Sequence, residues 1–252
     1  MSYLFQKKRA NSAITPLSFP DCDLWLDFTD VNSQSIVSDK IENIIDKSGS
    51  GNDYEQTNAA RRFDVVTNAY NGLQVASTVA NYFNSYMFTS QNYIDTDSDT
   101  WVIVSKNDDS GAANATIIGQ YGDVSAKLLL IRSDKDSAQD VFWVRDSGSN
   151  ILQSTPTLSP NLSILIATRE PGKITTDYND VVDTQTGTYA ATTYLNANNN
   201  PIIGAHPNFA GGLLGSVFFK GEIADIVKYK RVLSGDEIGL LKSRYLKPKW
   251  LL

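Results

Sequence analysis

The chain has 252 residues and a formal net charge of -6, from 22 Lys and Arg against 28 Asp and Glu. Glu stands at only five positions (42, 55, 170, 222 and 237), which leaves 23 Asp; because Asp favours turns and Glu suits helix interiors, a mostly helical protein is disfavoured. A single cysteine and a single histidine exclude an internal disulfide, a cysteine-based zinc site and metal sites with two imidazoles. The acidic charge predicts no nucleic-acid partner.

Residues 1–20 show no sustained hydrophobic period, and we expect them to form an arm or linker ahead of one domain that spans 21–252. The basic residues Lys7, Lys8 and Arg9 are followed by polar and small residues rather than by the apolar run of a secretory signal. No stretch approaches the ~18 apolar residues of a membrane span. We therefore expect the protein to stay in the cytoplasm where it is made, unless it leaves by cell lysis or by an unconventional route, and we expect no membrane insertion.

The first predicted strand begins at Cys22. Leu24, Leu26 and Phe28 alternate with Trp25 and with an aspartate, which is the period of two that a strand produces. A cluster of Gly, Ser, Asn and Asp over 44–53 then predicts a tight turn.

The middle of the chain repeats short apolar runs that are rich in β-branched and aromatic residues and bounded by turn formers. These runs cover 101–105, 115–119, 127–131, 141–144, 162–167, 201–204 and 215–219. Many short strands at fairly even spacing predict an all-β fold, an antiparallel β-sandwich or jelly roll.

One short helix is predicted near the carboxyl end. Residues 234–237 have the Ser-x-x-Glu form of a capping box, and Ile238, Leu241 and Tyr245 follow at helical spacing. We expect Pro248 to end the helix and the helix to cover a sheet edge or rim.

Several segments together resemble a known family. Residues 24–28, 46–53 and 71–75 resemble the opening of concanavalin A-like, laminin-G-type jelly-roll domains, and residues 219–238 and 245–250 resemble their closing strand, capped helix and tail. The likeness covers roughly residues 22–250 in the expected order. It implies a jelly-roll fold of the lectin and glucanase superfamily, while the matched turn and packing positions say little about function.

Catalysis is not predicted. Glucanases of the resembled group carry Glu-x-Asp-x-Glu on one strand, which aims two carboxylates at one face about 5–5.5 Å apart. The nearest match pairs Glu222 with Asp225, a spacing of three that predicts opposite faces of the sheet.

A weak calcium site is the one cofactor that we consider. Asp95, Asp97 and Asp99 have the spacing of a calcium loop, but Thr100 and Lys106 replace the Gly and Glu of an EF-hand. An irregular rim site of the laminin-G type stays open as an alternative. We favour a solvated turn before the next strand.

The remaining chemical features predict structure or, for some tyrosines, sugar binding. Cys22 is expected to be a small buried hydrophobe, His206 a loop residue, and the turn at 46–53 a structural element. Aromatic residues stack against sugar rings when exposed and otherwise fill cores. The glycan-binding candidates are Tyr82, Tyr86, Tyr93 and Tyr121.

The favoured hypothesis is a non-enzymatic structural or binding module of a bacteriophage virion, on the capsid surface, tail or fibre. Its expected partners are other virion proteins, host-surface glycans and further copies of itself. Lys7, Lys8 and Arg9 would attach the arm to the particle, unless the arm docks back on its own sheets through Leu4 and Phe5. The alternatives are a polysaccharide-degrading glycoside hydrolase of the glucanase group and an adhesion-like domain of a longer chain.

Overall fold

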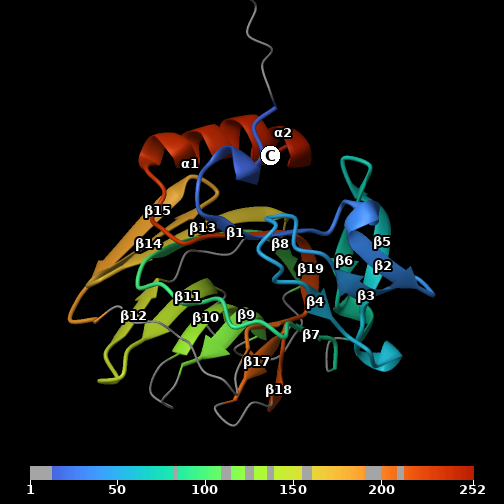
Figure 1. The fold of residues 1–252 in the computed structure, drawn as a ribbon, viewed down its shortest axis with the longest axis horizontal. Coiled ribbons are helices and arrows are strands. Elements are labelled where there is room, and N and C mark those ends of the chain that lie inside the picture. Colours follow the sequence, from blue (N-terminus) through green and yellow to red (C-terminus); the bar gives the residue numbers. More distant parts are fainter. Residues whose placement is uncertain are drawn as a thin grey trace, which may run out of the picture.

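A computed structural model describes residues 13–81, 84–108, 115–122, 128–134, 139–154, 161–190, 200–208 and 213–252. In this part of the chain two β-sheets pack face to face, and the C-terminal helix lies across the outside of one of them (Figure 1). The predicted all-β sandwich is confirmed, and each of the seven apolar runs contains or overlaps a strand.

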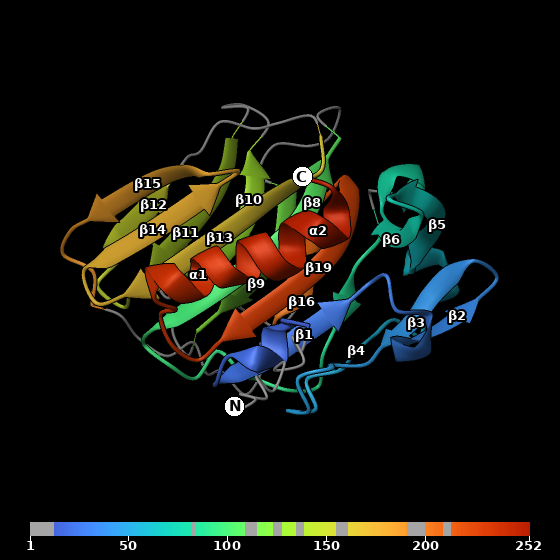
Figure 2. The same ribbon diagram turned by 90° about the horizontal axis from the view of Figure 1, so that it is seen from above.

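The helix-side sheet is antiparallel and lies directly beneath the C-terminal helix (Figure 2). In spatial order its strands are β15 (Val181–Thr186), β14 (Lys173–Tyr178), β13 (Ser163–Glu170), β8 (Asp99–Asn107), β19 (Gly221–Tyr229) and β1 (Cys22–Asp27).

The second sheet, here called the outer sheet, forms the opposite layer. Its strands in spatial order are β12 (Ile151–Ser154), β11 (Gln139–Arg145), β10 (Leu128–Asp134), β9 (Ala115–Tyr121), β16 (Ile202–Ile203), β7 (Met87–Phe88) and β4 (Tyr54–Glu55). The hairpin of β17 (Ala205–Pro207) and β18 (Leu213–Phe218) adjoins β9, and β18 meets it in parallel at one residue pair.

Four further strands close the sandwich along one side. They are β2 (Gln34–Val37), β3 (Lys40–Ile44), β5 (Phe63–Tyr70) and β6 (Leu73–Ser77). β3 pairs with β4 of the outer sheet, and β6 pairs with β19 of the helix-side sheet, so the hydrogen-bonded ladder runs from one layer to the other. Short 3₁₀ turns lie at Pro16–Ser18, Val31–Ser33, Ala59–Arg61 and Val79–Asn81.

The main core fills the space between the sheets. Leu24, Leu26 and Phe28 are all fully buried there, which confirms the alternation expected for the first strand. Trp25, on the opposite face of the same strand, belongs to a second core beneath the helix. β1 is therefore buried on both faces.

The C-terminal helix covers a sheet face rather than an edge or rim, so that expectation is wrong. It begins at the predicted capping box, where the Glu237 amide donates to Ser234 Oγ and the Ser234 amide donates to the Glu237 carboxylate at 2.8 Å. Leu241, Leu246 and Trp250 point into the second core. These apolar contacts hold the helix flat on the sheet.

Pro248 does not end the helix. The helix continues from α1 (Gly235–Leu241) through a π-helical turn (Lys242–Leu246) into α2 (Lys247–Trp250). A proline ring clashes with the carbonyl one turn earlier and offers no amide donor, and the wider π turn relieves that conflict.

Part of the predicted arm belongs to the domain. Phe19 is buried in the second core, and the Tyr229 hydroxyl donates to the Pro16 carbonyl at 3.0 Å. Packed structure therefore begins before residue 21. Lys7, Lys8, Arg9, Leu4 and Phe5 lie outside the described residues.

Candidate ligand-binding face

The outer sheet turns one face toward the core and the other away from the helix. Along β12 the exposed residues Ile151 and Gln153 alternate with buried ones, and the register of β11 places Arg145 opposite Ile151 and Trp143 opposite Gln153. Residues that stand opposite each other share a face, so Trp143 and Arg145 point outward. Both are half-buried.

Tyr121 joins these two residues on the same face. Leu128 of β10 stands opposite Tyr121 of β9 and opposite Arg145 of β11, so the tyrosine and the arginine are two strands apart in one row. Strand spacing puts their backbones about 10 Å apart, with Trp143 about 7 Å along the strand from Arg145. We call Tyr121, Trp143 and Arg145 the outer-face cluster.

The hairpin of β17 and β18 borders this face because the chain turns sharply at Gly204. This glycine has φ +86°, and a Cβ there would lie 2.8 Å from the Phe63 ring. After the turn, Pro207 passes over β9 at Gly119, where a Cβ would lie 3.1 Å from the proline Cδ. The positive φ and close backbone contact require glycine at Gly204, and the absence of a side chain at Gly119 leaves room for Pro207.

His206 also lies on this hairpin. It belongs to β17 rather than to a flexible loop, it is buried, and its Nδ1 lies 2.6 Å from the Pro207 carbonyl oxygen. Its ring centroid is 6.2 Å from that of Tyr121, so the histidine supports one side of the tyrosine ring.

The outer-face cluster has the chemistry of a shallow sugar-binding surface. Half-buried aromatic rings offer apolar faces to the C–H groups of a sugar, and the guanidinium donates hydrogen bonds to hydroxyl or carboxylate oxygens. Because the three side chains come from the regular strands β9 and β11, their spacing is fixed before any ligand arrives.

The structure separates the four predicted tyrosines. Tyr121 lies in the outer-face cluster, and Tyr82 falls outside the described residues. Tyr86 is half-buried elsewhere, with its ring 6.3 Å from Phe218. Tyr93 is buried in the main core and its hydroxyl lies 2.6 Å from that of Tyr54, so it cannot stack on a ligand at the rim.

Trp143 and Arg145 were missed by the sequence interpretation. Trp143 lies in the run 141–144, where an apolar strand is equally consistent with burial on both faces. A period-two assignment of that strand would place both residues on the same face, but only the register shows that Tyr121 shares it.

The calcium candidates do not converge. The side chain of Asp99 is fully buried. Its carboxylate accepts a hydrogen bond from Arg169 Nε at 3.1 Å and forms an ion pair with Nη2 of the same guanidinium. Asp95 pairs with Lys230 at 3.0 Å, and only Asp97 is exposed. Across the described ranges, no three His, Cys, Asp or Glu side chains gather as a metal site would require.

The predicted separation of Glu222 and Asp225 is wrong. β19 carries an extra residue, Ala224, where its register with β8 shifts. Glu222 stands opposite Lys106 and Asp225 opposite Val104, so both carboxylates point to the helix-covered face. A spacing of three in a regular strand places two side chains on opposite faces. The extra residue of the β-bulge brings Glu222 and Asp225 to the same face.

Shared direction does not make these residues a catalytic pair. Asp225 is fully buried and accepts hydrogen bonds from Trp250 Nε1 at 3.0 Å and from Lys249 Nζ at 2.9 Å. Glu222 accepts a hydrogen bond from the Tyr70 hydroxyl. The helix therefore covers Asp225 and keeps a polysaccharide away from it.

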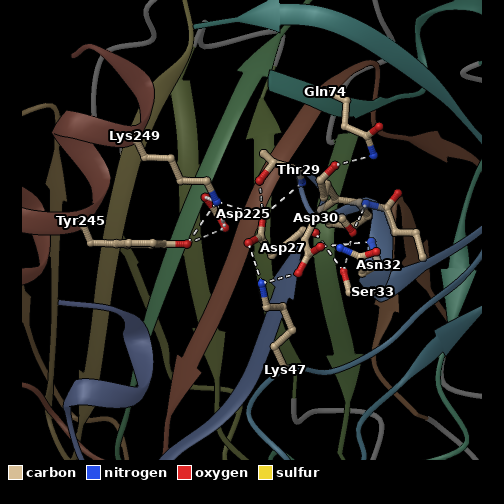
Figure 3. A network of polar contacts seen from close by, with 12 residues as sticks. Asp27, Thr29, Asp30, Asn32, Ser33, Lys47, Gln74, Asp225, Tyr245 and Lys249 are labelled. Atoms are coloured by element: carbon tan, nitrogen blue, oxygen red, sulfur yellow. Dashed lines mark hydrogen bonds and ion pairs between the residues drawn. The ribbon is translucent and has the colours of Figure 1, made fainter. Parts of the chain in front are cut away.

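Asp225 belongs to a polar network at the edge of the second core (Figure 3). Burial raises its pKa to about 6, despite Lys249. For Asp27 burial acts in the same upward direction, but Lys249, Thr29 and Lys47 outweigh it and lower the pKa. Through Lys249 the network ties the end of the helix to Asp27 and Asp225 of the sheet.

No helix in the part of the chain that the structure describes has the length and apolar character to cross a membrane.

Comparison with known proteins gives similarity in structure alone. No protein-family profile matches the sequence. No curated protein matches it either. The binding domain of Paraclostridial Mosquitocidal Protein 1 is similar with a TM-score of 0.60 at 15% identity, over 92% of this chain and 53% of that one. Domain 4 of AbnA, a GH43 extracellular arabinanase from Geobacillus stearothermophilus solved with arabinotriose, is similar with a TM-score of 0.60 at 12% identity. The match covers 86% of this chain and 96% of that domain.

Enzyme chains share the fold as well. A GH54 α-L-arabinofuranosidase variant is similar with a TM-score of 0.57 at 14% identity, over 81% of this chain and 50% of that chain. Against the NanB sialidase of Streptococcus pneumoniae the TM-score is 0.51 at 17% identity, over 61% of this chain, which spans only 26% of the sialidase. The chain thus has a jelly-roll β-sandwich fold, similar both to binding domains and to parts of glycoside hydrolases.

Proposed function

We propose that this chain is a non-enzymatic glycan-binding module that holds its ligand on the outer face of the outer sheet. The observation that carries the proposal is the outer-face cluster, in which the half-buried residues Tyr121, Trp143 and Arg145 share one face of the sheet that lies away from the C-terminal helix. The likeness to an arabinanase domain solved with arabinotriose supports the same class of ligand.

Binding would rest on a few contacts of known type. A sugar ring stacked on Trp143 buries apolar C–H groups, which supplies most of the affinity. Arg145 then donates hydrogen bonds to ring substituents and fixes orientation, while Tyr121, supported by His206, meets the next sugar along the chain. A site of this shape favours extended oligosaccharides over monosaccharides, because one sugar reaches only one aromatic side chain.

The glycoside hydrolase alternative receives less support. Its best carboxylate pair, Glu222 and Asp225, points to the sheet face remote from the outer-face cluster, and the helix buries Asp225 there. A hydrolytic site requires an acid and a base or nucleophile that both reach the same glycosidic bond.

A glycan array tests the proposal. We expect the wild-type protein to bind a subset of oligosaccharides, and Trp143→Ala to lose that binding while its melting temperature stays close to wild type. The matched control is Leu240→Ala, an exposed apolar residue on the helix at the opposite face, which should bind as the wild type does. Equal binding by Trp143→Ala would refute the assignment.

We also propose that the module belongs to a bacteriophage virion. This rests on the sequence, through the basic residues Lys7, Lys8 and Arg9 ahead of a lectin-like domain. Adjoining capsid or tail genes, together with the protein in purified particles, would support this placement. Neighbouring genes for secreted enzymes would oppose it.

A further inference from the structure

A lysine and an aspartate are buried together between the first and last strands that the structure describes. Lys228 of β19 exposes none of its side chain, and its Nζ lies 2.8 and 3.1 Å from the two carboxylate oxygens of Asp23 on β1. The same Nζ lies 3.4 Å from the Tyr93 carbonyl oxygen. The amine therefore approaches the Asp23 carboxyl group within the reach of a bond-forming encounter.

The backbone aims Asp23 at this position. The register of β1 with β19 shifts between Cys22 and Leu24, which makes Asp23 the extra residue of a bulge. A bulge redirects the side chain of its extra residue, and here the Asp23 carboxylate turns toward the interior, on the same side as the Leu24 side chain. Asn52 Nδ2 donates to the Asp23 carbonyl at 2.6 Å and holds the bulge in place.

The surroundings exclude water and favour neutral groups. The rings of Tyr93 and Trp101, both in the main core, lie with centroids 5.7 and 5.9 Å from the Lys228 Nζ. Burial is the largest cause that raises the pKa of Asp23 to about 6. Condensation joins a free amine to a carboxylic acid, and transfer of one proton from the lysine to the aspartate would supply both forms within the pair.

A second charged pair lies next to Asp23. Lys230 Nζ is 3.8 Å from Asp23 Oδ2 and 3.0 Å from Asp95 Oδ2. Its positive charge is placed to stabilise negative charge that develops on the Asp23 oxygen, as oxyanion donors do in acyl transfer. Asp95 holds Lys230 in this position.

We propose that Lys228 and Asp23 join in an intramolecular amide bond that links β1 to β19. The neutral amine of Lys228 attacks Cγ of the protonated Asp23 carboxyl group, and a tetrahedral intermediate forms with its oxyanion facing Lys230. The C–O bond to the hydroxyl breaks, the nitrogen gives up a proton to the departing hydroxyl, and one water leaves. No oxidant or other reactant is needed. The bond is separate from the outer-face cluster, so the two proposals stand independently.

Intact-mass spectrometry of the full chain tests the proposal directly. We expect a mass lower than the sequence mass by one water molecule. Trypsin should release a branched peptide that joins residues 10–40 to residues 221–230, because an acylated Lys228 is no longer cleaved. The sequence mass after prolonged incubation of the folded protein, or a water loss mapped to any other pair, would overturn the inference.

Two variants separate bond formation from folding. Lys228→Arg keeps a positive charge beside Asp23 but cannot form the amide, so it should retain the sequence mass. Lys230→Met changes a partly exposed neighbour and should slow the loss of water at least tenfold, with Lys230→Arg restoring most of the rate. A Lys228→Arg protein that still loses one water would contradict the proposal, and an unchanged rate in Lys230→Met would contradict the role given to Lys230.

Discussion

Lys249 lies between two buried aspartates from different strands. Its Nζ is 2.9 Å from Asp27 Oδ1 on β1 and 2.9 Å from Asp225 Oδ2 on β19 (Figure 3). Trp250, the next residue, donates its indole N–H to the same Asp225 oxygen at 3.0 Å. The last turn of the helix is thus held to the sheet by buried charge as well as by apolar packing.

Removal of the Lys249 charge should be costly. Lys249→Met leaves Asp225 buried without a cation, and breaking a buried pair in this way costs about 3–5 kcal/mol in the free energy of unfolding. Urea denaturation measures this loss. Lys247→Ala, which removes an exposed pair with Asp180, should cost less than about 1 kcal/mol. Equal losses in the two variants would mean that the burial of Lys249 is unimportant for stability.

Asp225 gives the stability curve a predictable pH dependence. Its pKa is raised to about 6 in the folded protein from 3.8, so the folded state binds this proton more tightly and Asp225 adds stability as pH falls from about 7 toward 4. Asp225→Asn mimics the protonated form and removes this contribution. The free energy of unfolding of the wild type relative to the variant should therefore rise, by on the order of 1–3 kcal/mol, between pH 7 and pH 5.

Other carboxylates oppose this trend at lower pH. The Arg231 guanidinium lowers the pKa of Glu237 to about 2, so the stability from that pair is present above its unfolded pKa and is lost as pH falls toward 2. Comparison of wild type with Asp225→Asn cancels this shared contribution. A difference that falls on acidification, or does not change, would contradict the raised pKa of Asp225.

The capping box makes a separate contribution. Ser234→Ala removes the oxygen that accepts the Glu237 amide and should cost about 0.5–2 kcal/mol, seen as a lower melting temperature. Ser243→Ala, an exposed serine inside the helical segment, is the matched control and should change stability by less than about 0.5 kcal/mol. Overlaid melting curves for Ser234→Ala and the wild type would show that the cap is dispensable.

Calcium should have no effect on stability. A calcium site needs six to eight oxygens, but Asp99 is committed to Arg169 and Asp95 to Lys230, which leaves Asp97 alone. Melting temperatures in millimolar calcium and in EDTA should coincide. A melting temperature that rises with calcium in the wild type but not in Asp97→Asn would support a calcium site at the rim.

The sequence predicted those parts of the fold that local chemistry decides. The alternation of Leu24, Leu26 and Phe28 needs only a period of two, and the capping box needs only Ser234 and Glu237, so both were recognisable without tertiary information. Such features depend on residues within one or two turns of each other.

The features that sequence reasoning missed depend on partners far along the chain. The bulge at Ala224 appears only in the register of β19 with β8, and it reverses the faces expected for Glu222 and Asp225. Likewise, nothing near Trp143 indicates that Tyr121 shares its face, because strand pairing across β10 brings the two into one surface. Tyr93 and Tyr121 are the same residue type, and only packing decides which is buried.

Two-dimensional NMR of the tryptophan indole N–H groups tests the proposed glycan site most directly. The chain has four tryptophans; Trp25, Trp101 and Trp250 are buried and Trp143 is half-buried on the outer face. Titration with the oligosaccharide selected on the array should move the Trp143 cross-peak, identified by its loss in Trp143→Phe, and leave the other three in place. Saturating glycan binding with the Trp143 cross-peak unmoved would contradict the account.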